Sequence, residues 1–497
     1  MDVLLAGFDQ VANVTALAMI VVGLTIGIVI GAIPGLNVPL AVAIALPITF
    51  NLNPIAGLGM LVGIYKGGTY GGSLSAILIN VPGTPAAAAT ALDGAELTRQ
   101  GKSGKALKMS LYASIIGEFI SDLALIAFAI PMALFALRIG PPEIFSLGIF
   151  ALTLVGVLSQ GNMIKGLIAG AMGLFLSTFG VDPLTGDFRL TFGVRKMAGG
   201  WAFIALVIGV FAVAEVLSVL ERRLGQRPLA GTVRLSDPDH SLTRNDWRRC
   251  LPVIARSSLI GVFIGAVPGL GAAVSAYLNY GITRNLSREP ERFGKGALEG
   301  VAAAESGNNA VTGATFVPLL TLGIPGDVIT AIMLGAFIVH GLIPGPVLFE
   351  QQGDFIAAFF IMMVLATFLH LVIARAGMAA FIQTTRVPNS VLFPIVITLS
   401  VTGVFVSTNS FFDIYVMLGF GVLGYLMKKF GFPVAPLLIG FILGPLVEVG
   451  LRQSMIMSRG GLDIFVTRPI SAVFLFLAVA TIAVVAWREF RSKKTGP

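Results

Sequence analysis

Apolar runs long enough to cross a bilayer recur along the whole chain, and they limit its fold more than any other feature. Four of them are Val11–Ala32, Ile115–Leu137, Trp201–Leu220 and Ile470–Trp487. A helix of about 17–25 apolar residues crosses the hydrocarbon core of a membrane. Only 12% of the 497 residues are charged, and a soluble domain carries about twice that share. Because backbone groups in lipid must form hydrogen bonds within the protein, the sequence predicts an all-α, polytopic integral membrane protein.

The charged residues and the single cysteine exclude several other classes of protein. The formal net charge is +8, but the basic residues lie in short loops between apolar runs, as residues that set membrane orientation do. The lipid bilayer is therefore the expected partner of this charge, and no nucleic acid is. A lone Cys250 excludes a disulfide framework and a cysteine-based metal site, and the three histidines have no metal-ligand spacing. We expect no metal and no cofactor.

Pro-Gly pairs and glycine runs interrupt the apolar stretches. A helix cannot pass through Pro-Gly without losing backbone hydrogen bonds. At membrane depth such a break is tolerated only where protein or a watery cavity satisfies the freed groups. The pattern predicts discontinuous helices and re-entrant hairpins, and a packing glycine beside a proline kink is the alternative for each break. The segments are Ala32–Asn37 (with Pro34 and Gly35), Gly67–Ser73, Asn80–Pro85, Ala266–Gly271 (with Pro268 and Gly269) and Gly323–Asp327.

The breaks belong to an internal duplication. Ile26–Leu36 (IGIVIGAIPGL) and Ile260–Leu270 (IGVFIGAVPGL) share 8 of 11 residues at an offset of 234, from 34 to 268. The later Pro-Gly pairs, Pro82-Gly83 and Pro325-Gly326, lie at an offset of 243. They are called the first and second tip, since each is expected at the end of a re-entrant hairpin. Repeats of this length are structural units. The predicted organisation is repeat one at 1–110, connecting transmembrane helices at 111–220, a basic cytoplasmic loop at 221–256, repeat two at 257–350, and C-terminal transmembrane helices with a basic tail at 351–497.

Loop charges indicate that the two repeats are inverted. Residues 221–256 hold eight arginines against four acidic residues, whereas the segment before repeat one has no basic residue. Basic loops stay in the cytoplasm, so corresponding loops lie on opposite sides and the N-terminus is expected outside. One loop disagrees. Residues 451–469 are expected outside but carry Arg452, Arg459 and Arg468.

Inverted repeats with discontinuous helices are typical of transporters. Half-helix N-termini attract carboxylates, and unwound carbonyl groups suit sodium. Glu305 and Asp327 are the candidates to accept a coupling cation, Na⁺ or H⁺. Lys66 is either a counter-charge for a carboxylate or a lysine that snorkels to an interface. The candidate substrate-binding residues are Asn37, Lys66, Gly67, Gly68, Thr69, Tyr70, Gly71, Gly72, Ser73, Pro82, Gly83, Thr84, Asn308, Asn309, Thr312, Pro325 and Gly326.

Glu118 and Asp122 share one helix face inside an apolar run. An intramembrane carboxylate is a functional candidate, but both lie outside the repeats, so a structural or partner contact is favoured. No complete Gly-x-x-x-x-Gly-Lys-Ser/Thr phosphate loop and no metalloprotease or hydrolase motif occurs. The sequence therefore predicts a protein that is neither an ATPase nor another enzyme. An intramembrane enzyme and a channel are the alternatives.

Several longer strings resemble one family. They are Gly31–Asn37, Tyr65–Ser73 (YKGGTYGGS), Asn80–Gly94, Glu305–Ala310 (ESGNNA) and Pro318–Gly335. At these strings the sequence resembles the TctA family, the large membrane subunit of the bacterial tripartite tricarboxylate transporters. Small departures are Ala95-Glu96, where Tyr-Pro is common, and Gly307, where alanine is frequent.

The resemblance implies a permease of the bacterial inner membrane with two partners, a small four-span membrane subunit and a periplasmic solute-binding protein. It also implies secondary, ion-driven symport without ATP. The implied substrates are citrate, other tricarboxylates and dicarboxylates, or aromatic carboxylates.

Overall fold

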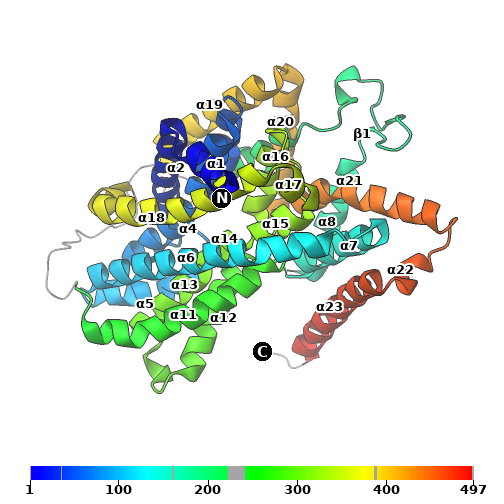
Figure 1. Ribbon diagram of the computed structural model, residues 1–497. Helices are drawn as coiled ribbons and strands as arrows, with labels where there is room; N and C mark the ends of the chain where they lie inside the picture. The colour runs from blue at the N-terminus through cyan, green and yellow to red at the C-terminus, as the bar shows by residue number, and fades with distance from the viewer. Residues whose placement is uncertain (1, 35, 159–161, 222–240, 385–388, 495–497) are drawn as a thin grey trace.

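The computed structural model describes residues 2–34, 36–158, 162–221, 241–384 and 389–494 (Figure 1). Within these ranges, nine helical segments are long and apolar enough to cross a membrane, which confirms the all-α polytopic fold. They are α2 (Val14–Ala32), α6 (Ser103–Ala136), α9–α10 (Phe203–Glu221), α11 (Arg244–Ala266), α18 (Gly353–Thr384), α19 (from Val391 to Thr408), α20 (Phe411–Lys429), α21 (Val434–Met457) and α23 (from Pro469 to Trp487).

The remaining elements are shorter or less apolar. The helices are α1 (Asp2–Val11), α3 (Val38–Thr49), α4 (Pro54–Ile79), α5 (Ala87–Arg99), α7 (Pro141–Leu158), α8 (Met163–Ser177), α12 (Gly271–Leu286), α13 (Leu298–Asn309), α14 (Val311–Ala314), α15 (Phe316–Leu322), α16 (Val328–Val339), α17 (Pro346–Gln351) and α22 (Ile464–Thr467). Within Phe203–Glu221, the π-helical turn η2 (Gly209–Val213) joins α9 (Phe203–Ile208) to α10 (Ala214–Glu221). The 3₁₀ turns are η1 (Arg195–Met197) and η4 (Pro290–Arg292), and β1 (Gly180–Val181) pairs with β2 (Phe188–Arg189).

The two repeats fold into the same succession of elements. The first copy is α2, α3, α4 and α5, and the second copy is α11, α12, α13–α15 and α16. Helices end before Pro34 and before Pro268, and again before the tips at Pro82-Gly83 and Pro325-Gly326. Four of the five predicted breaks are therefore present. Gly35 and residues 222–240 of the basic loop lie outside the described residues.

The fifth predicted break, Gly67–Ser73, was wrong, because α4 runs through it as one helix of 26 residues. Its glycines instead allow close packing against α2. A Cβ atom at Gly67 would collide with the carbonyl oxygen of Leu24, and one at Gly71 with that of Ile28. Glycine lowers helix propensity by about 1 kcal/mol, but here tertiary contact holds the helix together.

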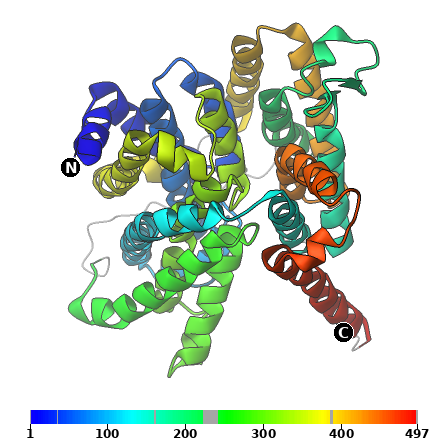
Figure 2. The same ribbon diagram turned by 45° about the vertical axis from the view of Figure 1, so that its right-hand side comes forward.

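The repeats, α6 and α18 lie on one side of the molecule, while α7, α8, α21 and α23 lie on the other (Figure 2). In this second group, α21 packs against α7 and α8, and α23 packs against α7. The candidate site lies between the two repeats and α6. Helix α18 packs against α4 and α6 beside it.

The arginines of the discordant 451–469 loop have acidic partners. Arg452 lies 2.6 Å from a carboxylate oxygen of Asp182, and this cation holds the pKa of Asp182 well below its usual range. Arg468 lies 3.1 Å from a carboxylate oxygen of Glu143. Two of the three arginines are therefore structural ion-pair partners, which gives them a role independent of membrane orientation.

Candidate functional site

The two copies interlock at the centre of the site. In the first copy α3 contacts α16 of the second, and the equivalent α12 contacts α5 of the first. Likewise α16 contacts α4, and α5 contacts α13. Each contact has its reciprocal, as expected for two copies related by a two-fold axis. This exchange brings the helix that follows each tip, α5 or α16, against helices of the opposite copy.

Both tips are seated in the same way within their own copy. A Cβ atom at Gly83 would collide with the carbonyl oxygen of Gly31 and approach the Cα atom of Gly72 to 2.9 Å. A Cβ atom at Gly326 would lie 3.0 Å from the carbonyl oxygen of Gly265 and 2.9 Å from the Cα atom of Thr315. Gly31 and Gly265 are equivalent at offset 234. The other equivalences, Gly72 with Thr315 and Gly83 with Gly326, follow the offset of 243.

Each tip ends in a residue whose side chain accepts a hydrogen bond from the start of the next helix, and of the two only Asp327 is an N-cap, since the N-cap of α5 is Ala86. Asp327 accepts a hydrogen bond from the backbone N–H of Thr330 at 2.8 Å, and Thr84 Oγ1 accepts one from Ala87 at 3.2 Å. Asp327 has one further partner, the hydroxyl of Tyr65 on α4, which donates to Oδ2 at 2.5 Å. Sequence reasoning missed Tyr65 as a site residue. The signal was a tyrosine in a buried apolar run, since a buried tyrosine hydroxyl usually needs a partner.

Glu305 is fully buried on α13 and is held by hydroxyl groups alone. Ser73 donates to its Oε1 at 2.5 Å, Thr90 also donates to Oε1, and Ser114 donates to Oε2 at 3.0 Å. In the described part of the chain no lysine, arginine or histidine forms an ion pair with it. The structure thus brings together Glu305 and Ser73 of the predicted site, and adds Thr90 and Ser114, which the sequence did not single out.

The two predicted asparagines differ in their contacts. Asn309 donates from Nδ2 to Ser114 Oγ at 2.8 Å and to the carbonyl oxygen of Glu305 at 3.0 Å. Asn308 is fully buried, yet neither its Nδ2 nor its Oδ1 has a hydrogen-bond partner among the described residues. Three other side chains near Glu305 each leave a single polar atom unpaired among the described residues: Tyr70 Oη, Ser110 Oγ and Asn309 Oδ1. Because buried polar atoms are nearly always paired, Asn308, with both of its amide atoms unpaired, is the strongest candidate of this site to receive a ligand.

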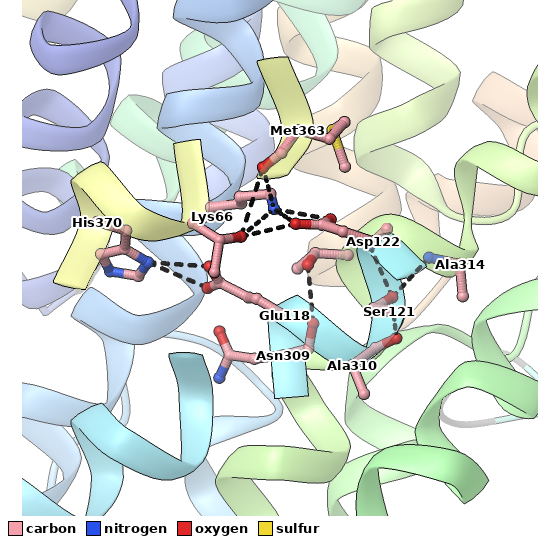
Figure 3. Close-up of polar contacts among 12 residues, drawn as sticks. Lys66, Glu118, Ser121, Asp122, Asn309, Ala310, Ala314, Met363 and His370 are labelled. Carbon is pink, nitrogen blue, oxygen red and sulfur yellow. Dashed lines mark hydrogen bonds and ion pairs between the residues drawn. The ribbon is translucent and has the colours of Figure 1, made fainter. Parts of the chain in front are cut away.

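Lys66 has its partners within the chain (Figure 3). Its ammonium group lies 2.6 Å from Oδ2 of Asp122 on α6 and donates to Thr367 and to the carbonyl oxygen of Met363 on α18. It is fully buried, so it does not snorkel to an interface. Its positive charge is neutralised by Asp122 rather than directed at the tips.

The helix face of Glu118 and Asp122 makes structural contacts. A carboxylate oxygen of Glu118 accepts a hydrogen bond from His370 Nδ1 at 3.1 Å, one helical turn away from the Lys66–Asp122 pair (Figure 3). Between them, Ser121 accepts from the N–H groups of Gly313 and Ala314 and donates to the carbonyl oxygen of Ala310. Ser121 thereby satisfies backbone groups freed where α13, α14 and α15 are interrupted, as membrane depth requires.

The other predicted substrate-binding residues are used in packing or capping. Thr69 donates to the carbonyl oxygen of Tyr65 in its own helix, α4, and Thr312 of α14 donates to that of Asn309, the last residue of α13. Asn37 caps α3, and Tyr70 packs edge-on against His370 with 5.4 Å between ring centroids. Gly68 lies against Val38 and Gly72 against Thr84. Pro82 is exposed, while Pro325 is buried.

Comparison with known proteins decides the family. The model of the tripartite tricarboxylate transporter TctA family matches residues 17–439. The chain belongs to this family. The TctA chain is also similar to two proteins of Agrobacterium vitis. It is 36% identical over 488 residues, 98% of this chain and 96% of the relative, to the "Uncharacterized 52.8 kDa protein in TAR-I ttuC' 3'region". It is 37% identical over 234 residues, 47% of this chain and 97% of the relative, to the "Uncharacterized protein in TAR-II ttuC' 3'region". No solved structure matches the chain.

Membership makes this TctA chain a multi-pass membrane subunit of a tricarboxylate transporter. The strings that carried the resemblance lie at its centre. Tyr65–Ser73 supplies the partners of Asp327 and Glu305, and Glu305–Ala310 supplies Glu305, Asn308 and Asn309. The geometry offers hydrogen-bond donors, a helix N-terminus after each tip and two carboxylates, Glu305 and Asp327, that form no ion pair with a basic residue among the described residues, and these features suit binding.

Proposed function

We propose that this TctA protein is the permease that carries tricarboxylates or related organic carboxylates across the bacterial inner membrane by ion-driven symport. A periplasmic solute-binding protein delivers the substrate, and a small four-span subunit completes the membrane complex. The observation that carries the proposal is the junction of the two copies. There Glu305 is buried with hydroxyl donors only, beside the unpartnered Asn308.

The charge of Glu305 supplies the physical reason for coupling. Two unit charges 4 Å apart repel by about 4 kcal/mol at an effective dielectric constant of about 20. An anionic substrate that enters this junction therefore needs Glu305 to be neutralised, either by Na⁺ or by a proton. Na⁺ prefers oxygen ligands, and Ser73, Thr90 and Ser114 provide them around the carboxylate. Substrate and coupling ion would then favour each other's binding.

Asp327 is the second candidate for a coupling cation. Its Oδ1 is engaged with Thr330 and its Oδ2 with Tyr65. A cation there would displace the Tyr65 hydroxyl. Glu305 is the better candidate, because three hydroxyls surround its two oxygens, whereas Oδ1 of Asp327 is already committed to a backbone N–H at the start of α16.

Two other classes of function fit the site less well. An intramembrane enzyme needs a nucleophile beside a base, and the hydroxyls around Glu305 have no histidine or lysine partner in the described residues. A channel needs a continuous polar pathway, whereas Glu305 and Asn308 are enclosed. An enclosed site at a repeat junction is the arrangement of an alternating-access transporter.

The test uses proteoliposomes that hold this chain with its small membrane subunit. Purified binding protein and radiolabelled citrate, with a panel of di- and tricarboxylates as competitors, are added outside, and a Na⁺ gradient or a pH gradient is imposed in separate arms without ATP. We expect saturable uptake that needs the binding protein and one of the two gradients. Uptake of equal rate without binding protein, or uptake that requires ATP inside, would show that the proposed function is wrong.

A further inference from the structure

The internal repeat gives each residue of the site a counterpart, and the packing fixes the register. Gly27 lies against Ile64, and its counterpart Gly261 lies against Gly307. Gly31 and Gly265 lie in the same way against Gly68 and Val311. Both pairs of contacts follow the offset of 243 along α4 and α13–α15. In this register, Tyr65 corresponds to Asn308 and Thr84 corresponds to Asp327.

The half of the site at the second tip is closed by the protein itself. The Tyr65 hydroxyl donates to the Asp327 carboxylate at 2.5 Å, and Asp327 caps α16. Val62 and Met333, the residues equivalent to Glu305 and Thr90, are fully buried in the apolar core. In this half a protein carboxylate therefore lies at a helix N-terminus, receives one hydroxyl from the opposite copy and has apolar surroundings.

The half at the first tip has the same framework and lacks the carboxylate. Like Asp327, Thr84 accepts a backbone N–H from the start of the next helix, that of Ala87 in α5, although the N-cap of α5 is Ala86. The Thr84 side chain is too short to reach across, and no bond joins it to Asn308. Asn308, the counterpart of Tyr65, keeps both amide atoms without a partner in the described residues. The apolar pair of the other half is replaced here by Glu305 and Thr90, which are hydrogen bonded to each other.

We propose that a carboxylate of the substrate binds at the first tip, between Asn308 and Thr84, where it takes the place that the Asp327 carboxylate holds at the second tip. The proposal rests on the proposed function and assigns its anion site to one of two equivalent positions. The Asn308 amide N–H and the Thr84 hydroxyl donate to the carboxylate, and the N-terminus of α5 adds its positive dipole end. In the second copy, the side-chain carboxylate of Asp327 then occupies the position that a substrate carboxylate occupies in the first copy.

This placement also orders the coupling ion relative to the substrate. Glu305 lies three residues before Asn308 on α13, and residues three apart on a helix are about 5–6 Å apart at Cβ. A substrate carboxylate held by Asn308 therefore lies close to Glu305. The ion that neutralises Glu305 binds next to the anion, and each removes the electrostatic penalty of the other.

The test measures citrate uptake by the reconstituted three-component system as a function of substrate concentration. Asn308→Asp keeps the shape but replaces the donor by an acceptor that repels a carboxylate, and Thr84→Val removes the other donor. Loss of one hydrogen bond to a charged group changes an equilibrium constant about tenfold or more, so we expect the half-saturating citrate concentration to rise by at least about tenfold in each. Ser306→Ala is the matched control, because Ser306 is equally buried on α13 and its hydroxyl bonds only to the carbonyl of Ala302.

Two further variants keep the test decisive. Asn308→Ala has no buried charge and serves if Asn308→Asp fails to fold. It removes no hydrogen bond to the described residues, so the loss of packing around the amide is the one cost that we expect to lower its melting temperature. Thr84→Asp places a carboxylate where the second copy has one, and we expect it to abolish citrate uptake in a protein that is still folded.

The outcomes separate this inference from the proposed function. If folded Asn308 and Thr84 variants have half-saturating citrate concentrations within about twofold of the wild-type value, the carboxylate does not bind between these residues. Citrate uptake by the wild-type protein in the same experiment would still support the proposed function. A wild-type protein that takes up neither citrate nor any carboxylate of the panel would overturn the proposed function itself.

Discussion

The ammonium nitrogen of Lys66 on α4 lies 2.6 Å from Oδ2 of Asp122 on α6, and neither side chain is more than 1% exposed. Thr367 of α18 hydrogen bonds to both members of this pair. The pair thus joins the central helix of the first copy to two helices outside the repeats. A buried charge that loses its partner is left uncompensated, whereas loss of both charges removes the problem.

We therefore predict that Lys66→Met alone and Asp122→Leu alone each destabilise the protein by about 3–5 kcal/mol. The double variant should recover most of that loss. The measurement is a double-mutant cycle on thermal unfolding of the purified protein in detergent. Glu96→Gln, which breaks the exposed Arg99–Glu96 pair, is the control and should change stability by less than about 1 kcal/mol. A double variant as unstable as the sum of the two single variants would contradict the prediction.

Glu305→Gln keeps the shape of the side chain and removes its charge. Because hydroxyls can still donate to the remaining amide oxygen, we expect the fold to survive. If Glu305 takes the coupling ion, the half-saturating ion concentration should rise by about tenfold or more, the effect of one charge-assisted contact. Uptake is measured at fixed citrate with Na⁺ varied at constant pH, and then with pH varied at zero Na⁺. An unchanged ion dependence in both series would mean that Glu305 is a structural residue only.

The packing around Gly83 and Gly326 predicts that an added methyl group lowers the stability of the protein by different amounts at the two tips. At Gly83 the new Cβ atom collides with the backbone oxygen of Gly31, which cannot move without shifting α2. At Gly326 the nearest atoms are 2.9–3.0 Å away and include the side chain of Thr315. Overpacking costs about 1–3 kcal/mol and more where backbone must move. We expect Gly83→Ala to lower the melting temperature more than Gly326→Ala, and Gly199→Ala, which has open space around it, to leave it unchanged. The reverse order of the first two would show that the tips are not seated as described.

The sequence predicted where the helices around this site end, because proline and glycine act on the backbone at their own positions. Pro-Gly pairs at 82–83 and 325–326 end helices wherever they occur, and both tips are where the repeat placed them. The glycine run at 67–72 was misread for the complementary reason. Whether glycines break a helix or let a neighbour approach depends on α2, which lies some 40 residues earlier in the chain.

The side-chain contacts were harder to predict because their partners are distant in sequence. Glu305 and Asp327 stood out as acidic residues in apolar surroundings. Their partners Tyr65, Thr90 and Ser114 come from α4, α5 and α6. A tyrosine in an apolar run is a weak signal for Tyr65, but small hydroxyl residues are common in membrane helices, so nothing local marks Thr90 and Ser114. Lys66 was predicted either to bind a carboxylate or to snorkel to an interface, and its actual partner, Asp122, could not be predicted because it is 56 residues away.

Access to the first tip gives a test that does not depend on kinetics. Cys250 is the one cysteine of the sequence, and it is buried. A Cys250→Ser background therefore carries no thiol. Thr84→Cys in that background places a thiol at the proposed carboxylate position, which is half-buried. We expect it to react with a membrane-impermeant methanethiosulfonate reagent, and we expect citrate with the coupling ion to slow that reaction by about tenfold or more, as occupancy at about ten times the dissociation constant requires.

Val81→Cys is the matched control for this experiment. Val81 is next to the tip in sequence, is 42% exposed and has no place in the proposed site, so we expect its reaction to be indifferent to ligand. Asp327→Cys reports on the second tip, where Tyr65 faces the substituted position. Since the second half is closed by the protein rather than by substrate, protection there should be weaker than at position 84. Equal protection at 84 and 327 would mean that substrate contacts both tips, and protection at 81 as well would mean that ligand moves the whole hairpin instead of covering one site.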